Sequence, residues 1–160
     1  MAIRNIVQQG DSILTKKCRT VEKFDDRLFE LLDDMKETLA RSGGVGLAAP
    51  QVGILKRVVV IDTGDKMVEF INPEVIKTSG SQQSVEGCLS CPDIWGITNR
   101  PMFATIKAQN RNGDEFTMDG EGLLAKAFCH ECDHLDGILF TKYIIKKVDP
   151  AELERKRRKK

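Results

Sequence analysis

The chain has 160 residues, of which 41% are hydrophobic and 31% are charged, a composition ordinary for a globular protein with one core. No apolar run approaches the roughly 20 residues that cross a bilayer, and the first residues lack the apolar centre of a signal peptide. We therefore expect a cytoplasmic protein without a membrane partner. The five cysteines, an odd number, are expected to stay reduced there.

Charge is unevenly distributed along the chain. The net charge is +1, but residues 155–160 read RKRRKK and hold six of the 25 basic residues. This leaves 19 basic residues against 24 acidic ones in residues 1–154. The acidic body argues against a DNA-binding surface, and the basic end forms a cationic tail.

Residues 25–41 are predicted to form a surface helix. Its apolar residues recur at helical spacing, at Leu28, Leu32, Met35 and Leu39. Asp25 or Asp26 is placed to cap its start, and Gly43 and Gly44 are placed to end it.

Loops and strands follow this helix. Residues 44–53 form a glycine-rich loop, 57–62 a strand, and 67–76 a second strand that Pro73 is expected to interrupt. Residues 84–96 show neither a helical nor a strand period, so no regular element is predicted there.

A hairpin and a second helix come next. Residues 103–110 and 115–120 are predicted to pair around Asn112-Gly113, a strong turn signal. Residues 121–136 are predicted to be helical, and Gly137 is placed to close that helix. Its inward positions are expected to be Leu123, Leu124, Ala127, Phe128 and Leu135.

These elements predict one domain over residues 1–160. Asp149-Pro150 suits the cap and first turn of a C-terminal helix, so residues 150–160 are expected to form a basic helix or a solvated tail. Strands that come first and one buried helix that comes late predict an α+β fold. We expect antiparallel or mixed β-sheets around the helix that carries the histidines, together with an N-terminal and a C-terminal helix.

The strongest chemical signal is the motif HECDH (130–134), which contains the only two histidines of the chain. Residues four apart on a helix share one face, so His130 and His134 can hold one tetrahedral metal ion. Glu131 is then placed to move protons of a water on that metal. The alternative is a helix with two solvated or core histidines.

Two histidines leave a catalytic metal one protein ligand short. Cys88 is one candidate, because a thiolate suits zinc or ferrous iron. Glu152 and Glu154 are the others, but they belong to a highly polar terminal stretch that is poorly suited to holding a ligand rigidly.

Three segments resemble the signature motifs of peptide deformylases, in the order and approximate spacing of that family. They are GVGLAAPQVG (44–53), EGCLS (86–90) and HECDHLDG (130–137). The resemblance covers nearly the whole chain, including the opening MAIRNIVQQGD. It implies a metal-dependent hydrolase that removes the formyl group from the N-terminal formyl-methionine of new polypeptides and releases formate.

The resemblance also implies roles for individual residues. Cys88, His130 and His134 would bind the metal, with water as the fourth ligand. The family points to ferrous iron, although this donor set also accepts zinc, nickel or cobalt. Glu131 would be the catalytic acid and base. The side-chain amide of Gln51 and the backbone N–H of Leu89 would face the formyl oxygen.

A substrate pocket is expected beside the histidine helix. Leu123, Lys126 and Ala127 share the face of His130. With Val45 and Gly46 they would wall a pocket for the methionine side chain, as the matching positions do in deformylases. Leu123 and Ala127 are alternatively plain core residues, and the charge of Lys126 is expected to reach outward at the rim.

Several other polar residues and cysteines lie within or near these motifs. Glu86 and Arg100 are expected to form a structural salt bridge that holds the cysteine loop, as an equivalent pair does in the family. Cys129 replaces a glutamine usual before the first histidine, and we expect Cys129 and Cys132 to be buried small hydrophobes. Cys91 forms a C-x-x-C with Cys88, and a structural four-cysteine site is a remote alternative.

Two competing functions remain open at the level of sequence. One is a zinc peptidase that uses His130, His134 and a downstream glutamate. The other is a metal-stabilised module that binds RNA through RKRRKK. If the chain is a deformylase, the same tail is a candidate contact for ribosomal RNA.

Overall fold

The computed structural model describes residues 2–152. Their helices are α1 (Asp26–Ser42) and α2 (Leu123–Leu135), with short 3-10 helices η1 (Ser12–Thr15), η2 (Ala49–Val52) and η3 (Phe140–Tyr143). Their strands are β1 (Gly46–Ala48), β2 (Val58–Asp62), β3 (Met67–Ser79), β4 (Gln82–Cys88), β5 (Cys91–Arg100), β6 (Phe103–Gln109), β7 (Glu115–Glu121) and β8 (Ile144–Val148).

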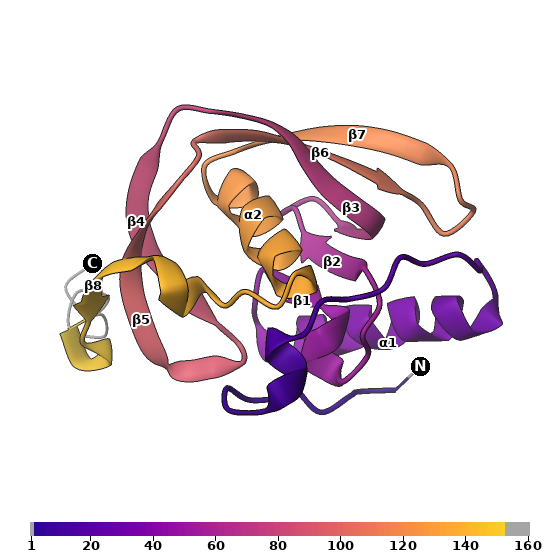
Figure 1. Cartoon of the computed structure of the whole chain (residues 1–160), viewed down its shortest axis with the longest axis horizontal. Helices are drawn as coiled ribbons and strands as arrows, with labels where there is room; N and C mark the ends of the chain where they lie inside the picture. Colours follow the sequence, from indigo (N-terminus) through magenta and orange to yellow (C-terminus); the bar gives the residue numbers. More distant parts are fainter. Residues whose placement is uncertain (1, 153–160) are drawn as a thin grey trace.

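The strands form two antiparallel sheets with α2 at the centre of the molecule (Figure 1). One sheet has the order β1-β2-β3-β6-β7, and the other has the order β4-β5-β8. The predicted α+β class and the central histidine helix are therefore confirmed. None of the helices in the described part has the length and apolar character that a bilayer crossing requires.

The larger sheet is covered on both faces, which explains the continuous apolar run of β2. Successive strand residues point to opposite faces. Val59 and Ile61 accordingly pack in the cluster that contains Phe128 of α2, whereas Val58 and Val60 pack in the cluster formed with α1. The sheet therefore packs against α2 on one face and against α1 on the other.

Helix α1 is the predicted N-terminal helix. The Asp25 side chain accepts a hydrogen bond from the Leu28 N–H at 3.1 Å, and Gly43 ends the helix in the left-handed region at φ 74°. The four apolar residues expected on one face are all buried: Leu28, Leu32, Met35 and Leu39.

The predicted β-hairpin is confirmed, whereas the strand expected to be interrupted at Pro73 is continuous. Strands β6 and β7 pair around a turn in which Gly113 has φ 86°. Strand β3 runs through Pro73, but its pairing with β6 shifts between Ile71 and Glu74. A proline cannot donate to the ladder, and the shift accommodates it.

The region without a predicted element is a long hairpin, so the prediction for residues 84–96 is corrected. Strands β4 and β5 cover it, and β8, also not predicted, pairs with β5. Their burial does not alternate regularly, because polar side chains hold this sheet to α2. A pattern search for alternating apolar residues therefore misses these strands.

Helix α2 matches its prediction except at its first residue. Ala127, Phe128 and Leu135 are buried, and Gly137 follows the helix at φ 76°. Leu123, expected inside, is 59% exposed. It begins the helix, and side chains of helices point toward their N-terminus, so it extends past the sheets that bury the later turns.

The C-terminal helix falls mostly outside the described residues. The Ala151 N–H donates to the Asp149 side chain at 2.9 Å, which is the cap expected before Pro150.

Candidate metal centre and active site

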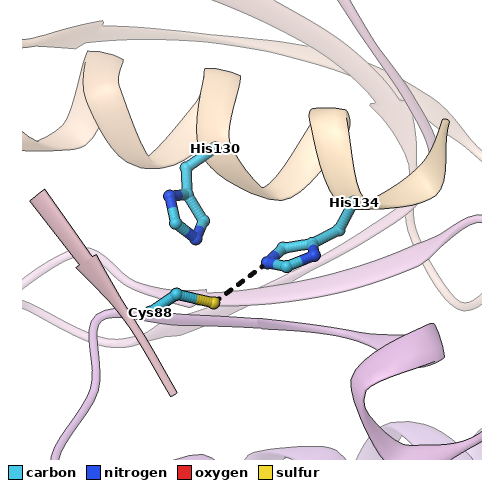
Figure 2. Close-up of side chains that lie close together, drawn as sticks. All are labelled: Cys88, His130 and His134. Atoms are coloured by element: carbon cyan, nitrogen blue, oxygen red, sulfur yellow. Dashed lines mark hydrogen bonds between the residues drawn. The ribbon is translucent and has the colours of Figure 1, made fainter. Parts of the chain in front are cut away.

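Two turns of α2 and the end of β4 bring three ligand-type side chains together (Figure 2). One ligand atom from each of Cys88, His130 and His134 lies within 4.8 Å of the others. The Cys88 Sγ is 3.4 Å from the His134 Nε2, and the two imidazole rings are 5.0 Å apart. Within residues 2–152 this is the one such group of histidine, cysteine or carboxylate side chains.

The other candidate ligands are not part of this group. Glu152 is described but lies outside it, and Glu154 falls beyond the described residues. Cys129 and Cys132 are half-buried, less than expected. Both line a cavity of about 450 Å³ with Arg57 and Asn72, so the four-cysteine alternative has no geometric support.

His130 is oriented by a buried carboxylate. Its Nδ1 lies 2.5 Å from the Glu86 Oε2. Burial raises the pKa of Glu86, but hydrogen bonds from His130 and Arg100 outweigh this and hold the pKa well below its usual range. Glu86 is therefore an acceptor, and Nδ1 carries the proton. The Nε2 of His130 is left as the ligand atom.

The expected salt bridge between Glu86 and Arg100 is confirmed. The Arg100 Nη2 is 2.8 Å from the Glu86 Oε2, and the side chains are 6% and 3% exposed. Thr98 donates a further bond of 2.7 Å to Glu86, and the Arg100 Nη1 contacts Asp133 at 2.8 Å. Arg100 thus joins β4 to α2. Sequence reasoning missed Thr98 and Asp133, because nothing local marks their partners.

His134 is a neutral imidazole at physiological pH. Burial lowers its pKa to about 3. Its Nδ1 and the Glu131 Oε1 are buried and have no hydrogen-bond partner among the described protein groups. Two imidazoles, a thiol and a carboxylate with a free oxygen match a catalytic site with three protein ligands and one open position. The residues present therefore fit a divalent cation.

Glu131 is buried directly beside this cluster. It is 4% exposed, and burial raises its pKa to about 7. A Cβ added at Gly46 would lie 2.7 Å from the Glu131 Oε2, so only glycine lets β1 pass this close. At neutral pH such a carboxyl group can both accept and release a proton.

Gln51 is held so that its amide nitrogen faces Cys88. Its Oε1 accepts from the Ala48 N–H at 3.0 Å. Its Nε2 donates to the Ser90 Oγ at 3.1 Å and lies 3.6 Å from the Cys88 Sγ. Leu89 follows Cys88 in the turn between β4 and β5, with its side chain close to Gly44.

The opening segment of the chain braces both loops. The Val7 N–H donates to the Gln51 carbonyl at 2.7 Å, and the Gln9 N–H donates to the Ser90 carbonyl at 2.8 Å. These backbone bonds give the N-terminal residues a structural task near the site.

The residues expected to contact substrate lie on β1 and α2. Val45, adjacent to β1, and Leu123 are exposed, and Ala127 is buried. The Lys126 Nζ, expected to reach solvent, instead donates to the Ser84 Oγ at 2.9 Å and the Val85 carbonyl at 3.0 Å. Two acceptors on β4 compensate the desolvation that lowers the pKa of Lys126.

Cys91 lies beside the cluster without belonging to it. It is buried at the start of β5 and is the cross-strand partner of Cys88. The neighbouring Cys91 thiol, together with burial, raises the pKa of the Cys88 thiol. A cation would reverse this preference, since a coordinating thiol is deprotonated.

Comparison with known proteins identifies the family. The family model for polypeptide deformylase matches residues 3–149. A peptide deformylase of Caldicellulosiruptor bescii is 55% identical, over 98% of this chain and 95% of its own length. One of Acetivibrio thermocellus is 52% identical over 100% of this chain and 94% of its own length.

Solved structures agree with this assignment. The crystal structure of a peptide deformylase from Legionella pneumophila has a TM-score of 0.87 and 39% identity, covering 98% of this chain and 92% of that one. The peptide deformylase of Thermotoga maritima also gives 0.87 and 39%, covering 90% and 99% respectively. The chain therefore belongs to the polypeptide deformylase family, hydrolases that remove the formyl group from the N-terminus of newly made polypeptides.

Proposed function

We propose that Cys88, His130 and His134 hold one divalent cation, with Glu131 as the acid and base of formyl hydrolysis. The observation that carries this proposal is the convergence of the three ligand atoms within 4.8 Å. Ferrous iron is the proposed cation, by resemblance to the family. Zinc, nickel and cobalt also suit two imidazoles and a thiolate.

When bound, the cation supplies a Lewis acid that makes water acidic near neutrality. Glu131 accepts a proton from the attacking water at Oε1, the oxygen without a protein partner. The same carboxyl group then releases the proton to the departing amine nitrogen. The C–N bond of the formamide breaks, and formate and a free methionine amine result.

The developing negative charge lies on the formyl oxygen, which needs fixed donors. Gln51 provides its Nε2, because the bond from the Ala48 N–H to Oε1 fixes which end of the amide faces Cys88. Leu89 provides its backbone N–H from the neighbouring turn. Neither group titrates near neutrality, so both stay donors throughout the reaction.

Substrate recognition is proposed along β1 and the first turns of α2. Val45, Gly46, Leu123, Lys126 and Ala127 would surround the methionine side chain. Strand β1 is an edge strand of the larger sheet, so an extended peptide can pair with it. The exposed side chains of Val45 and Leu123 would become covered when methionine binds.

The proposed partners are nascent formyl-methionine polypeptides, met in the cytoplasm where they are made. Glu86, Thr98 and Arg100 take no part in the chemistry. They hold His130 in the orientation that presents Nε2 to the cation.

The test is formate release from formyl-methionine peptides, with metal analysis of protein purified anaerobically. The variant Cys88→Ser should lose most of its metal and its activity, because the weaker hydroxyl replaces a thiolate ligand. Glu152→Ala is the matched control and should keep both. A Cys88→Ser protein that retains full metal, with loss in Glu152→Ala, would instead favour a peptidase-type site.

A further inference from the structure

The hairpin of β4 and β5 places a second thiol opposite the proposed metal ligand. Cys88 ends β4, Cys91 begins β5, and only Leu89 and Ser90 separate them. The two cysteines are cross-strand partners in the ladder. Partners in antiparallel strands have Cα atoms about 4.5–5.5 Å apart. This falls within the range of about 4.4–6.8 Å that a disulfide requires.

The two thiols interact but have unequal access to solvent. Cys88 is half-buried and lies in the active site, whereas Cys91 is 2% exposed. Each thiol shifts the pKa of the other, upward for Cys88 and downward for Cys91. The proposed mechanism uses Cys88 and has no role for Cys91. A buried thiol that is paired across the hairpin with a functional one can react with it before solvent does.

We propose that Cys91 is a resolving cysteine that captures oxidised Cys88 as an intramolecular disulfide. This inference rests on the proposed role of Cys88 as a metal ligand. It would make loss of the metal by oxidation a reversible event.

The oxidant is hydrogen peroxide or an organic hydroperoxide. The Cys88 sulfur attacks one peroxide oxygen, which breaks the O–O bond, forms a sulfenic acid and releases water from hydrogen peroxide or an alcohol from an organic hydroperoxide. The Cys91 sulfur then attacks the Cys88 sulfur, the S–O bond breaks, and a second water leaves. Overall, two thiols and one hydrogen peroxide yield one disulfide and two waters.

The disulfide has two consequences for the site. It removes the thiolate, so two histidines alone remain and the cation is released. It also stops oxidation of Cys88 to the sulfinic and sulfonic acids, which a thiol does not reverse. A dithiol reductant can restore the pair by attacking the more accessible Cys88 sulfur, with Cys91 as the leaving thiolate.

The experiment uses the full chain loaded with zinc, which has no redox chemistry of its own. The protein is treated with stoichiometric hydrogen peroxide, and zinc release to a chromogenic chelator is followed. The protein is then alkylated and digested with trypsin, and the peptide masses are measured by mass spectrometry. Cys88 and Cys91 lie in one tryptic peptide, residues 78–107, because trypsin does not cleave Arg100-Pro101, and the other three cysteines lie in other peptides. A disulfide therefore appears as a loss of two hydrogens and of both alkyl groups in that peptide.

Wild-type protein should release zinc, show this mass loss, and rebind zinc in full after dithiothreitol. Cys91→Ser should gain two or three oxygens on the same peptide, and dithiothreitol should restore little of its zinc binding. Cys132→Ser is the matched control and should behave as the wild type. Cys91→Ala repeats the test with a different side chain, and zinc content before oxidation verifies that each variant is folded.

Absence of the disulfide in wild-type protein, or equal recovery of wild type and Cys91→Ser, would overturn the proposal. These outcomes differ from failure of the proposed function. If Cys88 is not a ligand, the disulfide forms without releasing zinc. If the protein binds zinc and releases formate but forms no disulfide, only the role of Cys91 is lost.

Discussion

At the scale of single residues, the site depends on the close approach of β1 to Glu131. The carboxyl group is buried, has one oxygen without a protein partner, and lies against the backbone of Gly46. Burial is also what raises its pKa to about 7. The contact with Gly46 therefore limits the position of the proposed acid and base, and its burial raises its proton affinity.

Glu131→Gln should keep the metal and lose formate release by about 10²–10⁴-fold, the usual contribution of a positioned acid or base. The amide is nearly isosteric with the acid, so the ligands stay in place while proton transfer is lost. The measurement is kcat together with bound metal per chain. A variant with near-normal kcat would remove Glu131 from the mechanism.

Gly46→Ala should lower activity on the order of 10²-fold, because a displaced catalytic group loses its alignment. The new Cβ would lie 2.7 Å from the Oε2 of Glu131, a buried side chain. The control is Gly44→Ala, whose Cβ would meet the Leu89 side chain at 2.9 Å and not Glu131. Similar rates for the two variants would show that activity does not depend on the close contact between residue 46 and Glu131.

At the scale of elements, ion pairs join parts of the chain that are distant in sequence. Arg100 of β5 links Glu86 of β4 to Asp133 of α2. On the opposite side of the molecule, Glu69 of β3 accepts from Arg111 in the turn between β6 and β7, and it pairs with Lys36 of α1 at 3.1 Å. These bridges fix α1 and α2 against the sheets.

Glu69→Gln should lower the free energy of unfolding at pH 7 by about 1–2 kcal/mol, as for other charged hydrogen bonds that are partly exposed. Burial raises the pKa of Glu69, but the contacts with Arg111 and Lys36 outweigh it, so the net pKa lies below the usual 4.5. A carboxyl group whose pKa is lower in the folded state stabilises the fold at every pH above its pKa in the unfolded state. This stabilisation is lost as pH falls through the pKa of the folded state.

The difference in the free energy of unfolding between wild type and Glu69→Gln should therefore become smaller as pH falls from 7 through 4.5 and below. Denaturant unfolding at several pH values measures it. The control is Glu115→Gln, because Glu115 forms an exposed ion pair with Lys107. This substitution should change the free energy of unfolding by less than about 0.5 kcal/mol. A difference that is constant with pH would contradict the electrostatic account.

At the scale of the whole molecule, α2 is enclosed by two sheets that supply different parts of the site. The larger sheet presents β1 beside Glu131, and the smaller one presents Cys88 at the end of β4. Strand β8 is the edge of the smaller sheet, and the chain continues from it toward the basic residues 155–160.

Deleting residues 151–160 should leave hydrolysis of short formyl-methionine peptides unchanged, because no proposed site residue lies there. It should weaken co-sedimentation with ribosomes, since six basic residues can contact phosphates. Binding of the full chain should fall steeply with salt. Ribosome binding that survives the deletion, or that ignores salt, would rule out this role for the tail.

Features that depend on neighbours along the chain could be predicted from the sequence alone. The apolar spacing of α1, the turn at Gly113 and the separation of His130 and His134 are local, and each has the geometry that its pattern predicts. Local patterns suffice here because helices and tight turns form contacts only a few residues apart.

Which groups from separate segments meet follows only from the folded chain. The fold pairs β4 with β5 where no period was visible, exposes Leu123 and ties Lys126 to β4. These contacts follow from strand pairing and from the end of a helix extending past its sheets. Neither strand pairing nor an exposed helix end produces a repeating pattern in the sequence. The partner residues lie on separate segments, and only the folded backbone fixes the distance between them.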